Sequence, residues 1–288
     1  MDRIEHRAAA LRQLLQGPRI VRLVGGHDGL TAKLIHQAGF EGVWASSFAA
    51  SASHGVPDAS ILSMNQFLDV AELMTLAAPL PVIADGDTGF GDARNFAYAV
   101  HRYEARGIAG ICIEDKRFPK INSFADAAQD LLPAAEFAGK IRAGKQAQTG
   151  SQFLVIARTE ALIAGGDLDE ALERAHLYAD AGADAILVHS KSVYPDQVLK
   201  FGATWDRGVP LIAIPTTYPQ VTETELFDAG YRVVIYANHG IRATVRTVAD
   251  TLHALSRDGT AGNLEDALAS MADVFALQGM PAAFKAAP

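Results

Sequence analysis

The stretch "FLVIARTEALIAGGDLDEALERAHLYADAGADAILVHSK", residues 153–191, contains a complete strand–helix–strand unit. The runs 153–158 and 185–190 are apolar at consecutive positions, which is typical of strands buried on both faces of a parallel sheet. Between them, residues 168–182 show the helical spacing of apolar residues and end in Ala-Gly, a common stop signal for helices. The stretch therefore predicts two parallel strands joined by a right-handed helical crossover.

The same unit recurs along the chain. Eight apolar runs are typical of strands, at residues 20–24, 42–46, 81–85, 109–115, 153–158, 185–190, 210–215 and 232–237. Strands and helices that alternate in this number predict an α/β fold, a (β/α)8 TIM-like barrel forming a single domain over residues 1–288. An open doubly wound sheet is the alternative. We favour the barrel because polar residues follow nearly every strand, whereas an open sheet gathers them at one switch point.

Two helices are predicted after the last strand. The eighth barrel helix covers about residues 241–257, and a further helical stretch covers residues 264–279. The apolar positions of the second stretch form a stripe. Such a stripe needs a partner to bury it, and another subunit is one candidate.

The composition excludes several classes of protein. Of the 288 residues, 49 % are hydrophobic and 20 % are charged, as in ordinary globular proteins. The net charge of −8 argues against nucleic acid or an anionic membrane as the main partner. The chain shows neither a secretory signal nor an apolar run of about 18–20 residues, the length of a membrane span. The single cysteine, Cys112, is expected in the core and allows no intramolecular disulfide, so we expect a cytoplasmic protein.

Acidic residues follow the predicted third and fourth strands, where a barrel carries its active site. Asp85 and Asp87 are two positions apart and can face the same way, and Glu114 ends the adjacent strand. Three close carboxylates repel one another unless protons or a cation neutralise them, and all-oxygen ligands suit Mg²⁺ or Mn²⁺. The alternative is that one acid caps a helix and the others pair with Arg or Lys. The glycines of residues 86–91 are expected to let the backbone turn tightly beside these acids.

Two basic residues end the predicted fifth and sixth strands. Arg158 offers a planar fork for carboxylate or phosphate oxygens, and His189 can donate to an oxyanion or shuttle a proton. Together with a metal they favour a small anionic substrate. Each has an alternative, since Arg158 can pair with an acid such as Glu160 and His189 can be a hydrogen-bonded structural residue.

Polar groups also follow the predicted second strand. Ser46, Ser47 and the backbone of Phe48 offer hydroxyl and N–H groups suited to a carboxylate, and Trp44 lies just before them. Asp58, in the same long loop, is either a nucleophile or a turn-forming aspartate. From its spacing alone we favour the turn.

Several of these motifs resemble one known family. "DGDTGFG" (85–91), "GICIEDKRFPKINS" (110–123), the stretch from Val155 to Lys191 and "VIYANHGIRA" (234–243) resemble the phosphoenolpyruvate mutase / isocitrate lyase superfamily, above all its phosphonate branch. The resemblance runs over nearly the whole chain. It implies a (β/α)8 barrel with a gating loop at 115–130. It also implies terminal helices, about residues 241–279, that are exchanged between subunits of a tetramer built as a dimer of helix-swapped dimers.

The resemblance also implies roles for the candidate residues. Asp85 matches the direct Mg²⁺ ligand, with Asp87 and Glu114 acting through water. Trp44, Ser46, Ser47 and Phe48 match positions around the carboxylate and enolate end of the substrate. Asp58, Arg158 and His189 match residues around the phosphoryl group, and Lys120, Asn122 and Ser123 lie on the gating loop.

The implied reaction interconverts phosphoenolpyruvate and 3-phosphonopyruvate with Mg²⁺, through a metaphosphate-like phosphoryl transfer. The alternative is hydrolysis of phosphonopyruvate to pyruvate and phosphate. Asn122 favours the mutase, since the hydrolase carries Thr there, whereas Ile121, Phe124 and the segments 55–64 and 215–220 depart from the mutase pattern or resemble the hydrolase.

Other activities are disfavoured by residue chemistry. A carbon–carbon lyase of the superfamily uses a cysteine on the gating loop, and residues 116–130 contain none. An oxaloacetate decarboxylase leaves Lys120 without a clear role. A metal–oxyacid sensor would bind without turnover, which the full set of acid, Arg, His and Lys residues argues against.

Overall fold

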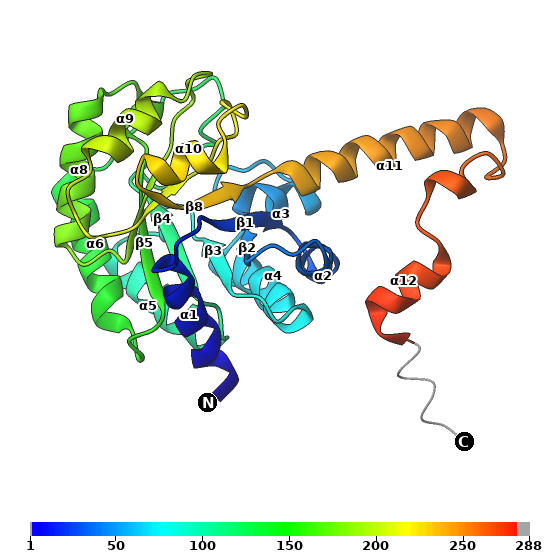
Figure 1. Ribbon diagram of the computed structural model, residues 1–288, viewed down its shortest axis with the longest axis horizontal. Coiled ribbons are helices and arrows are strands. Elements are labelled where there is room, and N and C mark those ends of the chain that lie inside the picture. The colour runs from blue at the N-terminus through cyan, green and yellow to red at the C-terminus, as the bar shows by residue number, and fades with distance from the viewer. Residues whose placement is uncertain (1, 281–288) are drawn as a thin grey trace. The chain divides into compact units, whose positions relative to one another are not determined.

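The computed structural model describes residues 2–280, and the chain divides into two units after His239. The first unit is a closed barrel of eight strands in sequence order, and all neighbouring strands are parallel (Figure 1). The strands are β1 (Val21–Gly26), β2 (Gly42–Ala45), β3 (Val82–Asp85), β4 (Gly110–Glu114), β5 (Leu154–Thr159), β6 (Ala185–Val188), β7 (Leu211–Ala213) and β8 (Tyr231–Tyr236). The predicted closed barrel is confirmed, and the open sheet is excluded because β1 pairs with β8.

Helices surround this barrel and follow the strands in turn (Figure 1). In the first unit they are α1 (Asp2–Leu15), α2 (Gly29–Gln37), α3 (Ser47–Ser53), α4 (Met64–Ala77), α5 (Ala93–Ala105), α6 (Ala134–Ala147), α7 (Ala161–Ala164), α8 (Leu168–Asp180), α9 (Asp196–Thr204) and α10 (Glu223–Asp228). Several begin at a capping box, in which the capping side chain accepts from the third helical N–H and that residue's side chain reaches back. Asp28, Ser63, Asp92 and Thr222 cap α2, α4, α5 and α10 in this way.

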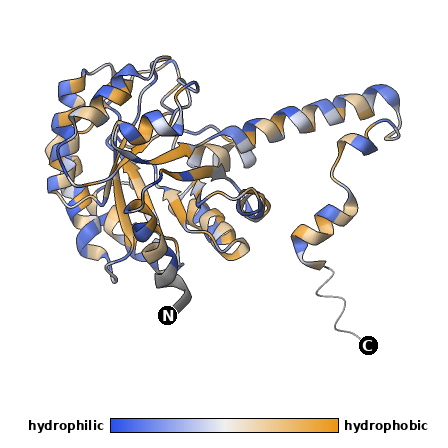
Figure 2. Ribbon diagram, viewed as in Figure 1, coloured by the Kyte–Doolittle hydropathy of each residue, from blue (hydrophilic) through white to orange (hydrophobic). Residues whose placement is uncertain are grey.

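Alternation along the strands creates two apolar layers, because successive side chains point to opposite faces. On β4, Ile111 and Ile113 pack outward against the helices, whereas Cys112 packs inside the barrel. Glu114 therefore continues the inward-facing row, and Asp85 does so after Ile83 on β3. Figure 2 shows the strands as the most hydrophobic part of the first unit.

The amino-terminal helix α1 closes one end of the barrel. Ala8 and Leu11 are buried in the cluster that fills the barrel interior. Arg12 holds the helix in place by donating to the backbone oxygens of Gln152 and Phe153, at 2.8 and 3.1 Å, where β5 begins. The opposite end, where the strands finish, is the end that carries the polar residues.

The second unit contains α11 (His239–Asp258), the short 3-10 helix η1 (Glu265–Ala267) and α12 (Met271–Gln278). The helical stretch predicted over 264–279 is present as two separate elements, because Ser270 starts a new helix with a capping box to Asp273. The structure describes no helix between residues 2 and 280 that combines the length and apolar character of a membrane span.

Candidate active site

A cavity of about 220 Å³ lies at the end of the barrel where the strands finish. Its lining comes from the ends of several strands and from the loops that follow β2 and β4. The lining residues are Trp44, Ser46, Ser47, Phe48, Asp58, Asp85, Lys120, Asn122, Ser123, Phe124, Arg158, His189, Ile214, Thr216, Ala237 and Asn238. All of the predicted site residues except Asp87 and Glu114 are therefore part of one cavity wall.

The loop after β2 places two serines beside the acid that ends β3. Ser46 caps α3, its hydroxyl accepting from the backbone N–H of Ala49. Ser47 Oγ donates to Asp85 Oδ2 at 2.8 Å. The contact fixes the Asp85 carboxylate relative to the hydroxyl groups that face the cavity.

The loop after β3 turns sharply, as its glycines predict. Gly89 and Gly91 have positive φ angles, and so do Asp87 and Phe90, at 50° and 63°. Two contacts support this conformation. Glu114 N donates to Asp87 O at 2.7 Å, and the buried Lys140 side chain donates to the backbone oxygens of Thr88 and Gly91.

Burial raises the pKa values of two acids of the site, Asp85 and Asp87. It raises the pKa of Asp85, and the nearby charges of Glu114 and Asp58 add to the effect. It also raises the pKa of Asp87 to about 7, with Asp85, Asp58 and Glu114 adding to it. Lys120 Nζ, which lies 3.1 Å from Asp87 Oδ1, opposes that shift.

These acids do not form a compact three-ligand cluster, and none occurs elsewhere in residues 2–280. Two buried oxygens, Asp87 Oδ1 and Glu114 Oε1, accept no hydrogen bond within the described chain and meet only the ammonium groups of Lys120 and Lys116, at 3.1 and 3.5 Å. Buried carboxylate oxygens with spare acceptor capacity fit a hard divalent cation. The donor set therefore suits a divalent cation held by carboxylate oxygens.

The loop over residues 115–130 reaches across the cavity to the loop after β2. Lys120 Nζ lies 2.7 Å from Asp58 Oδ1, and Asn122 Nδ2 donates to Asp58 Oδ2 at 2.6 Å. Lys120 N also donates to Ser60 Oγ at 3.0 Å. The Asp58 carboxylate thus accepts from both side chains. A residue that only forms a turn would not need these contacts.

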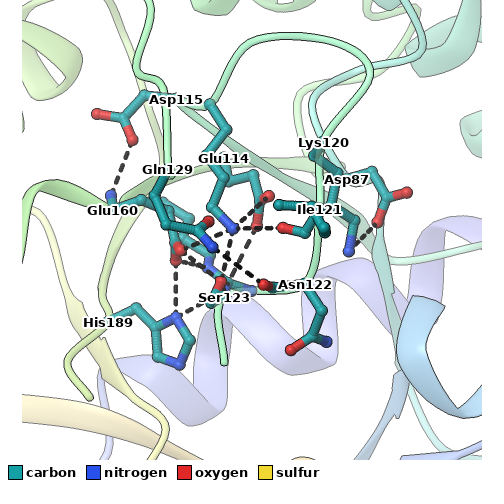
Figure 3. Close-up of polar contacts among 12 residues, drawn as sticks. Asp87, Glu114, Asp115, Lys120, Ile121, Asn122, Ser123, Gln129, Glu160 and His189 are labelled. Carbon is teal, nitrogen blue, oxygen red and sulfur yellow. Dashed lines mark hydrogen bonds and ion pairs between the residues drawn. The ribbon is translucent and has the colours of Figure 1, made fainter. Parts of the chain in front are cut away.

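Arg158 and His189 meet a third residue, Glu160, which is fully buried. Arg158 Nε lies 2.5 Å from Glu160 Oε1, and His189 Nδ1 lies 2.7 Å from the same oxygen and 2.6 Å from Arg158 Nη2. Figure 3 shows His189 and Ser123 gathered around Glu160. The alternative foreseen for Arg158, a pair with Glu160, is observed while Arg158 also lines the cavity.

Burial and neighbouring charges set the protonation states of His189 and Glu160. Burial and the Arg158 guanidinium both lower the pKa of His189, so the imidazole is neutral at pH 7. Burial alone would raise the pKa of Glu160. Arg158, His189 and Lys116 outweigh it and hold that pKa well below its usual value, so Glu160 is ionised.

Some residues of the site were given no role from the sequence. Lys116 is buried in the polar network, and Phe124, Thr216 and Asn238 line the cavity. Glu160 was foreseen only as a partner of Arg158, and it lies two positions after Arg158 on the inward-facing row.

The chain is similar to known proteins over most of its length. The family described as phosphoenolpyruvate phosphomutase matches residues 11–256. The chain belongs to the phosphoenolpyruvate phosphomutase family. Among relatives of this family, phosphonopyruvate hydrolase of Variovorax sp. (strain Pal2) is 45 % identical over 272 residues, 94 % of each chain. Phosphoenolpyruvate phosphomutase of Tetrahymena pyriformis is 41 % identical over 270 residues, 93 % of this chain and 90 % of its own.

Two solved structures superpose closely on this chain. The phosphoenolpyruvate phosphomutase of Streptomyces platensis subsp. rosaceus has a TM-score of 0.95 and 50 % identity, over 96 % of each chain. Phosphonopyruvate hydrolase in complex with oxalate and Mg²⁺ has a TM-score of 0.90 and 44 % identity, over 96 % of this chain and 95 % of its own. The resemblance seen in the sequence is confirmed.

Proposed function

We propose that the protein is a Mg²⁺-dependent mutase that interconverts phosphoenolpyruvate and 3-phosphonopyruvate. The observation that carries the proposal is the pair of contacts from Lys120 and Asn122 to Asp58, which draws the loop 115–130 over the cavity. We call this loop the lid. Relatives that are 39–42 % identical carry the name phosphoenolpyruvate phosphomutase, which supports the assignment.

The reaction is a rearrangement without a net change in atoms. The C–P bond of phosphonopyruvate breaks, its electron pair stays on the pyruvate fragment as an enolate, and the enolate oxygen then bonds to phosphorus. The hydroxyls of Ser46 and Ser47 and the backbone of Phe48, at the start of α3, are suited to hold the carboxylate and enolate oxygens. Trp44 packs beneath them as part of the cavity wall.

The phosphoryl group is held on the other side of the cavity. A loose transition state spreads negative charge over three oxygens, so positioning and charge stabilisation carry the catalysis. Arg158 and Lys120 supply positive charge, while Asn122 supplies an amide donor. His189 Nδ1 donates to the ionised Glu160 at 2.7 Å, so the other ring nitrogen of the neutral imidazole is an acceptor for a proton of the substrate.

Asp58 is placed to orient the two lid side chains around the phosphoryl group. Its two carboxylate oxygens each take one contact, from Lys120 and from Asn122. Because Lys120 neutralises it, Asp58 can lie beside an anionic group at lower electrostatic cost. We assign Asp58 a positioning role in the mutase.

A divalent metal completes the proposed site. We propose Asp85 as its direct ligand and Asp87 and Glu114 as ligands through water, with Mn²⁺ as the substitute for Mg²⁺. The raised pKa of Asp85 and the buried oxygens of Asp87 and Glu114 that accept no hydrogen bond support this donor set. When bound, the ion would stabilise negative charge on the enolate and carboxylate oxygens of the substrate.

Water control separates the two candidate reactions. A mutase must keep water from the metaphosphate-like group, and a hydrolase must admit it. Asn122 fills the lid position beside Asp58, with its amide donating to that carboxylate. Hydrolysis of phosphonopyruvate is the second candidate, and the 45 % identity with a phosphonopyruvate hydrolase favours it.

The direct test is incubation of the purified protein with phosphonopyruvate and Mg²⁺, followed by ³¹P NMR. We expect a phosphoenolpyruvate signal that requires the metal and disappears on chelation. Inorganic phosphate and pyruvate as the only products would replace the mutase by the hydrolase.

We further propose that the second unit docks on another copy of this chain, as a helix-exchanged dimer within a tetramer. Four residues of α11, Val245, Val248, Leu252 and Leu255, are exposed at spacings of three and four, the pattern of one apolar helix face. Mass measurement in solution tests the oligomer, and a monomer would contradict it. A cytoplasmic location is part of the proposal and is supported by the single cysteine.

A further inference from the structure

The carboxylate of Glu160 divides its contacts between two parts of the molecule. Its Oε1 atom accepts from Arg158 Nε at 2.5 Å and from His189 Nδ1 at 2.7 Å, and both of these residues lie at strand ends. Its Oε2 atom takes Ser123 Oγ at 2.5 Å and lies 3.2 Å from Lys116 Nζ. One oxygen therefore contacts the residues that face the substrate, and the other contacts the loop that covers it (Figure 3).

Lys116 stands where the loop leaves the barrel. It pairs with Leu131 in an isolated antiparallel bridge, and Arg117 N donates to Asp130 O at 2.9 Å. These contacts join the two ends of the loop at its base. The Lys116 Nζ atom donates to Ile121 O at 3.0 Å and to Ser123 Oγ at 2.7 Å.

Ser123 is the point at which the loop meets the fixed residues. Its hydroxyl oxygen lies within hydrogen-bond distance of Lys116, Glu160 and Arg158, at 2.7, 2.5 and 3.1 Å. All four side chains are buried, with at most 7 % of the residue surface exposed. Movement of the loop that withdraws Ser123 removes a donor from Glu160 Oε2 and a partner from Arg158 in the same step.

We propose that Glu160 is a positioning residue that couples closure of the lid to the alignment of Arg158 and His189. The inference rests on the proposed function, since it assigns Glu160 a part in that reaction. Among the described residues, Glu160 is not one of those that line the cavity, so it acts through its neighbours and not on the substrate. With Ser123 in place, all the acceptor sites of an ionised carboxylate are occupied and its plane is fixed.

The coupling makes chemistry conditional on closure. When the lid is open, Glu160 loses Ser123 as a partner, and its carboxylate can rotate together with the Arg158 guanidinium. The productive geometry of Arg158 and His189 then forms only when water is already excluded. A mutase gains from this order of events because a metaphosphate-like group never forms in an open site.

Lid opening can be measured without turnover. Trypsin cleaves after Arg117 and Lys120 within the lid, and mass spectrometry separates these cuts from those that follow global unfolding. When opening and closing are fast, cleavage reports the open population. The rates are compared with and without oxalate and Mg²⁺ for the wild type, Glu160→Gln, Ser123→Ala and the double variant.

We expect Glu160→Gln and Ser123→Ala each to speed lid cleavage, and the double variant to be cleaved no faster than Glu160→Gln alone. The non-additivity should be at least about threefold, as for residues in one hydrogen-bond network. Glu104→Gln is the matched control, because that carboxylate also joins a helix to a loop, through Thr149 N and Gly150 N at 2.7 Å each. The control should leave lid cleavage unchanged.

Two outcomes overturn the proposal. Unchanged lid cleavage in Glu160→Gln would mean that Glu160 serves only Arg158 and His189, and additive effects in the double variant would mean that Ser123 acts independently of it. If Glu160→Gln fails to fold, Glu160→Asp replaces it, since the shorter side chain cannot reach both sets of partners. These results stand whether or not phosphonopyruvate is turned over, so failure of the coupling and failure of the proposed function remain distinguishable.

Discussion

The Lys120 ammonium lies 2.7 Å from one carboxylate oxygen of Asp58, and both side chains are almost fully buried. The contact joins the loop after β4 to the loop after β2 across the mouth of the barrel. We expect substrate entry to require that this contact and the Asn122–Asp58 hydrogen bond break. The structure is therefore that of a closed site, and the contacts that close it are also those that would surround the phosphoryl group.

Replacing Asp58 by Ala should open the lid and weaken catalysis together. We expect kcat/KM to fall by about 100-fold or more, because the variant loses the partner that positions both Lys120 and Asn122. Steady-state kinetics and trypsin cleavage within the lid measure the two effects. A catalytic loss without faster lid cleavage would contradict the role of Asp58 in closure.

Replacing Asp85 by Ala should abolish Mg²⁺-dependent activity while leaving the barrel folded. Asp85 ends β3, and its contacts are polar ones at the cavity, so its loss removes no apolar packing. Calorimetry with Mg²⁺ measures metal binding, and circular dichroism checks the fold. Retained metal-dependent turnover would show that Asp85 is not the direct ligand.

The Asn122→Thr variant should shift the products towards hydrolysis. Threonine is shorter than asparagine and cannot reproduce the 2.6 Å contact to Asp58, so water gains access to the phosphoryl group. The ratio of inorganic phosphate to phosphoenolpyruvate, followed by ³¹P NMR, should rise. An unchanged ratio would place the control of water at another residue.

Mg²⁺ binding should release a proton near neutral pH. In the metal-free protein Asp87 has a pKa of about 7 in place of 3.8, so the folded state holds an extra proton between these values. Its contribution to stability therefore falls as the pH rises through that window, and Mg²⁺ affinity rises across pH 7 because binding needs the ionised form. Calorimetry at about pH 6 and about pH 8 measures the change. The Asp87→Asn variant should lose this pH dependence, and its persistence there would rule out Asp87 as the source.

Leu11→Ala should destabilise the barrel without altering its chemistry. Leu11 is fully buried in the barrel interior at the end opposite the cavity. We expect the free energy of unfolding to drop by about 2–5 kcal/mol, the range for a buried Leu replaced by Ala. Chemical denaturation measures the loss. A change below about 1 kcal/mol would mean that α1 does not close the barrel as described.

The barrel and much of its site were predictable because strands alternate with a fixed period. The inward row that contains Ile83 ends in Asp85, the row of Cys112 ends in Glu114, and that of Ile156 ends in Arg158. The carboxyl ends of neighbouring parallel strands meet at one rim, so these residues had to converge. The boundary of α12 was less predictable, since the apolar stripe continues past Ser270 but the capping box begins a new helix there.

Contacts between loops could not be predicted from the sequence. Lys116 and Ser123 are seven positions apart on an irregular loop, where no period fixes the direction of a side chain. Their meeting with Glu160 depends on how that loop folds back over β5. Asp58 was likewise ambiguous from its spacing, and its contacts to Lys120 and Asn122 become visible only in three dimensions.

The central claim is that this closed site transfers the phosphoryl group within one substrate molecule and keeps water out. The most direct measurement is the reaction of phosphonopyruvate with the Mg²⁺-loaded protein in ¹⁸O-labelled water, with ³¹P NMR resolving the labelled and unlabelled products. We predict phosphoenolpyruvate whose phosphoryl oxygens carry no label. ¹⁸O-labelled inorganic phosphate with pyruvate, and no phosphoenolpyruvate, would contradict the account.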